Sequence, residues 1–104
     1  MLQLLKKLFG FGPKVNYLEL LQNGAVIIDV RTKAEYQSGH IKNSINMPLD
    51  SLSNNLSKLK KDKAVIACCA SGMRSAGAVS MLKSNGFTEV YNAGSWMSLQ
   101  NKIQ

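Results

Sequence analysis

The sequence is poor in the residues that hold small proteins together through covalent bonds or metal ions. It has two cysteines, Cys68 and Cys69, and a single histidine, His40. The cysteines are neighbours in the chain, and a disulfide between neighbours needs a strained geometry. There is no second cysteine pair, so the ligands of a zinc site are missing. We therefore predict reduced thiols, no metal site and a reducing, cytoplasmic location.

Long apolar runs are missing as well. Lys6 and Lys7 interrupt the apolar N-terminus, which is too short to span a membrane and shows no signal-peptide cleavage pattern. As a helix, this segment would gather its apolar side chains near one face: Leu2, Leu5, Leu8 and Phe9. We predict that residues 1–12 form a tail or a short amphipathic helix that packs on the domain. Contact of this segment with a partner or a membrane surface stays open.

Acidic residues are scarce. The chain has 6 Asp and Glu residues against 13 Lys and Arg residues, and its formal net charge is +7. Such a surface attracts nucleic acid, anionic lipid or small anionic substrates. Apart from Lys6-Lys7 and residues 58–63, however, the lysines are scattered, and aromatic residues do not alternate with them. We interpret these charges as solvated and predict no nucleic-acid partner.

Short apolar runs alternate with helix signals along the chain. The runs predict buried strands at residues 25–30, 64–69 and 89–91, and a brief strand at 44–48 that Pro48 ends. Capping residues predict helices that start near Asn16, Thr32, Asp50 or Ser51, Ser75 and Ser95. This alternation predicts an α/β fold with a mainly parallel sheet, in one domain at residues 13–104.

Both thiols lie at the end of the strongest predicted strand, in the stretch CCASGMRS at residues 68–75. Ligands of parallel sheets bind outside the carboxyl ends of the strands. Gly72 is free to adopt a positive φ, which would turn the loop amides inward as an anion-binding nest beside a helix N-terminus. Arg74 is a cation at that N-terminus, which makes sense if an anion sits there. We predict that Cys69 is a thiolate nucleophile and that Cys68 is a core residue.

The stretch CASGMRS at residues 69–75 resembles the active loop C-x-x-G-x-R-S of the rhodanese (thiosulfate sulfurtransferase-like) family. The stretch IIDVRTKAEYQSGHIKNSINMP at 27–48 resembles the upstream signature of that family. A third stretch, GFTEVYNAGSW at 86–96, is similar to the segment after the active-loop helix. The likeness covers nearly the whole chain from Val15 onward. In one departure, Ala93-Gly94 stands where the family usually has two glycines.

This resemblance implies a three-layer α/β/α fold with a central, mainly parallel sheet and no organic cofactor. It implies that Cys69 takes a sulfane sulfur from an anionic donor such as thiosulfate, holds it as a persulfide and passes it to a thiol or cyanide-like acceptor. Arg74 would bind the donor. The backbone around the sulfur would come from the other loop residues: Ala70, Ser71, Gly72, Met73 and Ser75.

Three further polar residues are assigned a supporting role. Asp29 and Arg31 flank the end of the first predicted strand, and we interpret them as partners that fix loops through charge-assisted hydrogen bonds. His40 follows a predicted turn, where a lone histidine is more often structural than catalytic. In the family, the G-H-I motif that contains this histidine is mainly a signature of the fold.

Three other functions stay open. The first is a sulfur-relay carrier, which would deliver a persulfide from Cys69 to one protein partner, with the basic surface docking an acidic one. The second is a phosphatase-like enzyme. Related phosphatase loops have five residues between cysteine and arginine, and this loop has four, residues 70–73. The third is a catalytically silent interaction module, which the presence of Cys69 disfavours.

Overall fold

The computed structural model describes residues 14–104, so the prediction about residues 1–12 lies outside the described residues. A parallel sheet with the strand order β2-β1-β3-β4 forms the centre of the described part. The strands are β1 (Val26–Asp29), β2 (Ile45–Asn46), β3 (Val65–Cys69) and β4 (Val90–Ser95). Each lies where the sequence predicts a strand, although β2 has only two residues and β4 continues past Tyr91.

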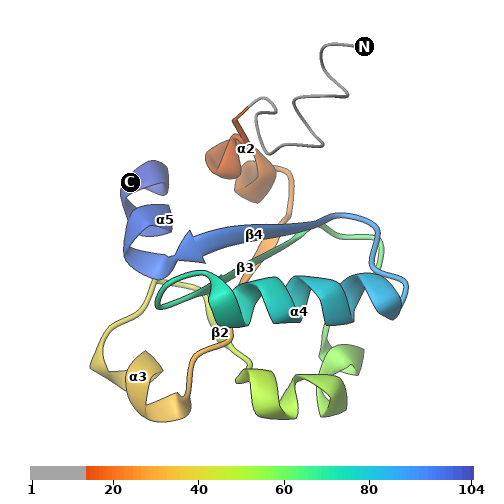
Figure 1. The fold of residues 1–104 in the computed structure, drawn as a ribbon. Coiled ribbons are helices and arrows are strands. Elements are labelled where there is room, and N and C mark those ends of the chain that lie inside the picture. The colour runs from red at the N-terminus through yellow and green to blue at the C-terminus, as the bar shows by residue number, and fades with distance from the viewer. Residues whose placement is uncertain (1–13) are drawn as a thin grey trace.

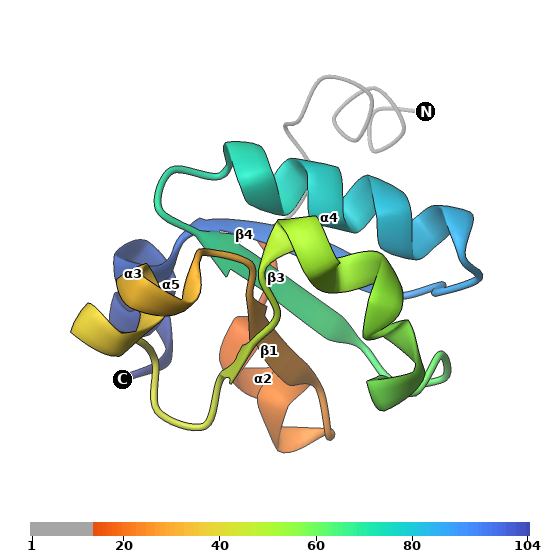
Figure 2. The same ribbon diagram turned by 90° about the horizontal axis from the view of Figure 1, so that it is seen from below.

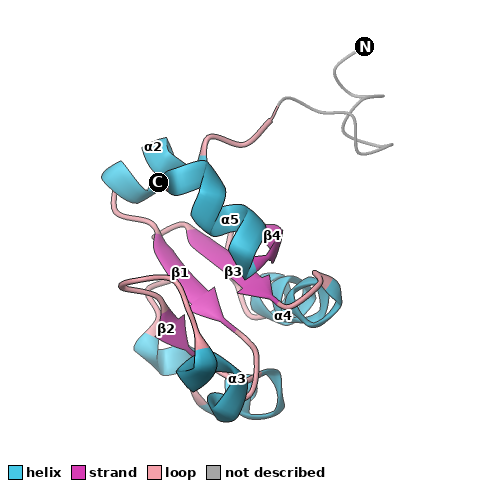
Figure 3. Cartoon of the chain, turned by 90° about the vertical axis from the view of Figure 1, so that its left-hand side faces the viewer, coloured by secondary structure: helices cyan, strands magenta, loops and turns pink. Residues whose placement is uncertain are grey.

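Helices cover both faces of the sheet (Figure 1), which confirms the predicted three-layer α/β/α fold. On one face lie α2 (Tyr17–Gln22) and α5 (Trp96–Ile103). On the other lie α4 (Met73–Ser84) and the 3-10 helices η1 (Leu49–Asn54) and η2 (Leu56–Lys58). The remaining helix, α3 (Lys33–Ser38), lies at the end of the sheet toward which the strands point (Figure 3). No helix within residues 14–104 is long and apolar enough to cross a membrane.

The central strand β3 is buried along its whole length because helices cover both of its faces. Its side chains alternate between two apolar clusters, as the pleat of a strand requires. Ala67 and Cys69 face the cluster under α4, which includes Leu82. Cys68 faces the opposite cluster, which includes Leu99 of α5. The two neighbouring thiols therefore lie on opposite faces of the sheet.

The helix predicted from Asp50 or Ser51 onward is wrong. Residues 49–58 form η1 and η2, and no side chain caps η1. The hydroxyl of Ser51 instead donates to the carbonyl of Pro48, and the amide of Asn55 donates to the carbonyl of Ser51. Such local bonds from serine and asparagine to the backbone compete with regular α-helix. Short 3-10 turns are the result.

The other predicted helix starts agree with the structure, with one shift. The caps Asn16, Thr32 and Ser95 each accept a bond from a backbone N–H in the first turn. The shift is in α4, which starts at Met73 rather than near Ser75. Gly72 adopts the left-handed conformation there, with φ of 106°, and thereby serves as the helix cap.

A buried ion pair lies at the carboxyl end of β1. The Asp29 side chain is fully buried and accepts hydrogen bonds from Nε and Nη2 of Arg31, the latter at 2.7 Å. The same guanidinium donates to the carbonyl oxygens of Glu35 in α3 and Gly39 just after it. It also lies 4.8 Å from the ring centroid of Trp96 at the start of α5. Arg31 thus ties β1, α3 and α5 together.

We expect Arg31→Met to lower the free energy of unfolding by about 3–5 kcal/mol, because it leaves the Asp29 carboxylate buried without its partner. Urea unfolding at neutral pH measures this change. Lys33→Met is the matched control. It also replaces a cation by methionine, but at an exposed position of α3, where about 0.5 kcal/mol or less is expected. Equal losses in the two variants would contradict the structural role of the ion pair.

Candidate active site

The site is built where β3 gives way to α4, in the loop of residues 70–72. Figure 2 shows this loop at the same end of the sheet as α3. The left-handed Gly72 turns the chain back, and it packs closely on β4. A Cβ at Gly72 would lie 3.3 Å from Cα of Gly94, so the site needs glycine here for its space as well as for its φ. Ala70 and Ser71 are exposed on the outer side of the loop.

Hydrogen-bonding groups of this loop and of the first turn of α4 surround the Cys69 sulfur. The N–H of Gly72 donates to Sγ at 2.9 Å, and Oγ of the buried Ser75 lies 3.4 Å from Sγ. Burial raises the pKa of Cys69, but hydrogen bonds from the backbone N–H groups of Ser75, Gly72 and Ser71 lower it. The net result is a pKa below the ordinary value of a thiol.

The pKa of Cys68 is shifted in the opposite direction. Burial, and then the nearby charge of Asp29, raise its pKa to about 12. This thiol stays protonated at neutral pH and packs as a small apolar side chain. The predicted core position of Cys68 agrees with the structure, and adjacent cysteines here have different chemical properties because they lie on different faces of one strand.

The positive charge of Arg74 is paired with a carboxylate. Its guanidinium binds both oxygens of Glu35 from α3, with nitrogen–oxygen distances of 2.6 and 2.9 Å. Both side chains are 36% exposed. The hydrogen bond from Arg74, followed by that from the backbone of Thr32, lowers the pKa of Glu35 to about 2, so the pair is ionised at neutral pH. Sequence reasoning identified Arg74 but missed Glu35.

A second residue missed by sequence reasoning is Asn92 on β4. Its side chain donates to the carbonyl of Gly72 at 3.1 Å and accepts from the hydroxyl of Ser75 at 2.6 Å. Asn92 is therefore bonded to two of the residues that surround the Cys69 sulfur. The sequence offered one signal for Asn92, its place in a predicted parallel strand. Because β4 is parallel to β3, Asn92 lies toward the same end of the sheet as Cys69.

The remaining predicted residues lie around this centre. Asp29 pairs in register with Cys68 across β1 and β3, so its ion pair with Arg31 adjoins the loop end of β3. His40 stacks on Tyr36 with ring centroids 3.7 Å apart, and its Nδ1 lies 2.7 Å from the Tyr36 carbonyl oxygen. Both contacts of His40 are therefore with Tyr36 of α3. Met73 is 82% exposed at the start of α4.

The chemistry that this arrangement supports is negative charge on sulfur. Amide N–H groups and the positive end of the α4 dipole surround Sγ of Cys69, which favours a thiolate and any anionic sulfur attached to it. Cys69 itself is fully buried beneath these groups. Among residues 14–104, no three His, Cys, Asp or Glu side chains gather as a metal site requires.

Comparisons with known proteins agree with this geometry. The model of the rhodanese-like domain family matches residues 14–102. The uncharacterized protein YqhL of Bacillus subtilis is 40% identical over 68 residues, which are 65% of this chain and 54% of that protein. The chain thus spans about half the length of this relative. Thiosulfate sulfurtransferase GlpE of Pseudomonas savastanoi is 34% identical over 73 residues, 70% of this chain and 69% of that protein.

A solved structure gives the same result for the fold. The rhodanese-like domain protein from Staphylococcus aureus superposes with a TM-score of 0.68 and 32% identity, over 77% of this chain and 83% of that one. The family model, the relatives and the solved structure all indicate the same family as the motifs around Cys69. This chain therefore belongs to the rhodanese-like domain family, whose relatives include sulfurtransferases.

Proposed function

We propose that this protein is a sulfurtransferase in which Cys69 receives a sulfane sulfur from an anionic donor and passes it to a thiol or cyanide-like acceptor. The observation that carries the proposal is the hydrogen bond of 2.9 Å from the Gly72 N–H to Sγ of Cys69, within a loop that lowers the pKa of this thiol. A thiolate so held is a nucleophile that needs no separate base. Reduced thiols fit a cytoplasmic location.

The transfer has two steps that resemble thiol–disulfide exchange. The Cys69 thiolate attacks the outer sulfur of thiosulfate, the sulfur–sulfur bond of the donor breaks, and sulfite leaves with the bonding electrons. The transferred sulfur is then the negative end of a persulfide, which the loop N–H groups stabilise in place. A thiolate or cyanide acceptor attacks this outer sulfur, and the thiolate of Cys69 is regenerated.

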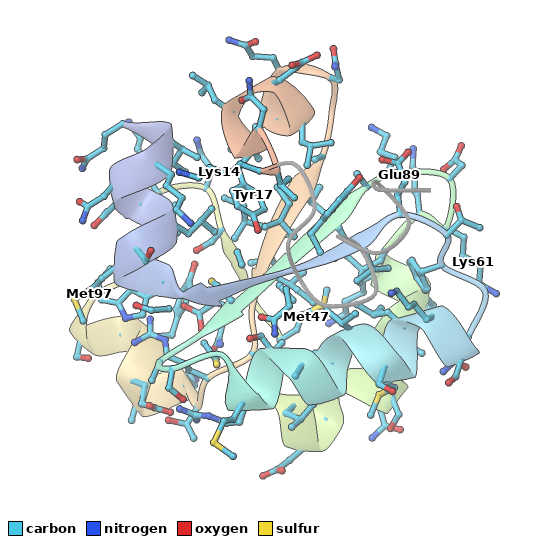
Figure 4. All side chains as sticks on the ribbon, turned by 45° about the horizontal axis from the view of Figure 1, so that its top comes forward. Lys14, Tyr17, Met47, Lys61, Glu89 and Met97 are labelled. Carbon is cyan, nitrogen blue, oxygen red and sulfur yellow. The ribbon has the colours of Figure 1, made fainter. Side chains whose placement is uncertain are left out.

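The second candidate function is a sulfur-relay carrier with a protein-borne persulfide donor or acceptor. The pairing of Arg74 with Glu35 favours it, because a paired guanidinium attracts a small anion less than a free one. Two methionines at this edge of the sheet are exposed, Met73 by 82% and Met97 by 57%. Figure 4 shows Met97 where α5 begins, beside α3. Exposed methionines are adaptable contacts for a protein partner.

Mass spectrometry of the intact protein after incubation with thiosulfate tests the proposal. We expect the wild type to gain one sulfur atom, which cyanide then removes. Cys69→Ser is expected to gain none, because it lacks the attacking thiolate. Cys68→Ala is the matched control, and we expect it to load like the wild type because the Cys68 thiol is buried and protonated.

A second donor separates the two candidate functions. If thiosulfate does not load the protein but glutathione persulfide does, the relay carrier is supported and thiosulfate is excluded as the donor. Loading of the Cys69→Ser variant, or no loading of the wild type by either donor, would overturn sulfur transfer through Cys69.

We expect Glu35→Gln to lower the KM for thiosulfate about two- to fivefold, because it frees the charge of Arg74 for the donor. Glutamine can still act in the capping box with Thr32, so α3 is preserved. Steady-state kinetics at low ionic strength measure the change, which added salt should reduce.

Glu89→Gln is the control for this charge change. Glu89 is exposed at the opposite end of the sheet from Met97 (Figure 4), and its removal should leave KM unchanged. If Glu35→Gln has no more effect than Glu89→Gln, Arg74 does not contribute to donor binding in the proposed way.

A further inference from the structure

Asn92 owes its position to an irregularity of β4. Along the pairing of β3 with β4, Ala67 lies opposite Asn92, but the next residue, Cys68, lies opposite Gly94. Ala93 is therefore the extra residue of a β-bulge, and Gly94 has a positive φ of 75°. Bulges re-aim side chains at strand ends. Here the side chain that the bulge presents to the active loop is the amide of Asn92.

The hydrogen bonds of Asn92 fix which way round its amide lies. Its Nδ2 lies 3.1 Å from the carbonyl oxygen of Gly72, a group that only accepts. Its Oδ1 lies 3.0 Å from the backbone nitrogen of Gly94, which only donates. The amide oxygen must therefore be the atom that faces Oγ of Ser75, at a distance of 2.6 Å.

This orientation determines where the hydroxyl hydrogen of Ser75 lies. The hydroxyl has a single hydrogen, and Oδ1 of Asn92 has none to donate. A contact of 2.6 Å between these two oxygens therefore requires the Ser75 hydrogen on the line between them. The side of Oγ that faces Sγ of Cys69, 3.4 Å away, then carries lone pairs. It can accept from a thiol, but it cannot donate to a thiolate.

We propose that Asn92 is a positioning residue that keeps the Ser75 hydroxyl directed away from the Cys69 sulfur, so that this hydroxyl favours the thiol over the thiolate. The thiolate is then stabilised by backbone N–H groups alone, such as that of Gly72. Asn92 acts through Ser75 and does not touch the sulfur. Its importance for catalysis rests on the proposed sulfur transfer, but its effect on the acidity of Cys69 does not.

The charged groups near Cys69 are the same in every variant needed for the test. On α4 the nearest cation is Arg74, which is paired with Glu35 of α3. On β1 the ion pair of Asp29 and Arg31 adjoins Cys68. Neither Asn92 nor Ser75 is charged, so replacing them with alanine alters hydrogen bonds without altering the net charge around the sulfur.

The test is the pH dependence of Cys69 alkylation by iodoacetamide, with the modified cysteine identified by mass spectrometry. The midpoint of the profile gives the acidity of the thiol. The plateau at high pH reports access to the sulfur, so an opening of the loop is seen separately. The measurement involves no sulfur donor, and its result is independent of whether sulfur transfer is confirmed.

We expect Ser75→Ala to leave the midpoint unchanged or to lower it, because the wild-type hydroxyl does not donate to the thiolate. We expect Asn92→Ala to lower the midpoint by about one pKa unit, a tenfold gain in thiolate well below the midpoint, because the freed hydroxyl turns to the charged sulfur. In the Asn92→Ala background, Ser75→Ala should raise the midpoint again by a similar amount.

Two results would overturn the proposal. A rise of about one unit in Ser75→Ala alone would show that Ser75 already donates to the thiolate in the wild type. A midpoint in Asn92→Ala that is unchanged or higher would show that Asn92 does not withhold the hydroxyl. Asn85→Ala is the control, since it removes another exposed asparagine that bonds a backbone carbonyl at the far end of α4. This variant should change neither the midpoint nor the plateau of the profile.

Discussion

The buried ion pair between Asp29 and Arg31 is the contact on which the arrangement of the site depends. The guanidinium joins the end of β1 to two carbonyls in and after α3 and to the ring of Trp96. Since α3 is held in this way, Glu35 is placed to bind Arg74 at the start of α4. An ion pair that does not touch the reactive sulfur thus determines the setting of the loop through two successive contacts. The first joins Arg31 to α3, and the second joins Glu35 of α3 to Arg74.

Within that frame, the loop stabilises negative charge mainly through the backbone. The N–H of Gly72 bonds the sulfur directly, whereas the nearest arginine is engaged with a carboxylate. Backbone dipoles fixed by a strand, a left-handed glycine and a helix start need no reorganisation when charge develops on sulfur. The same backbone would stabilise the outer sulfur of a persulfide. The opposite pKa shifts of Cys68 and Cys69 follow from the same architecture, because alternate residues of a strand have different surroundings.

Sequence patterns were informative where the cause of structure is local. The caps at Asn16, Thr32 and Ser95, and the thiol at the end of β3, agree with the structure because capping and strand alternation involve residues close in the chain. The pattern failed at residues 49–58, where serine and asparagine bond the nearby backbone instead of supporting an α-helix. The pattern also missed Asn92. The direction of its side chain depends on a β-bulge, which no residue pattern predicted.

The sequence by itself determined the fold class, the family motifs and the position of both thiols, because hydrophobic periodicity and short loop motifs are written in neighbouring residues. Only the tertiary structure decided which groups meet at the sulfur. Glu35 reaches Arg74 across 39 residues of chain, and Asn92 reaches Ser75 across 17. Contacts at such separations depend on how strands align and where helices start, and these are settled by packing of the whole domain rather than by local preference.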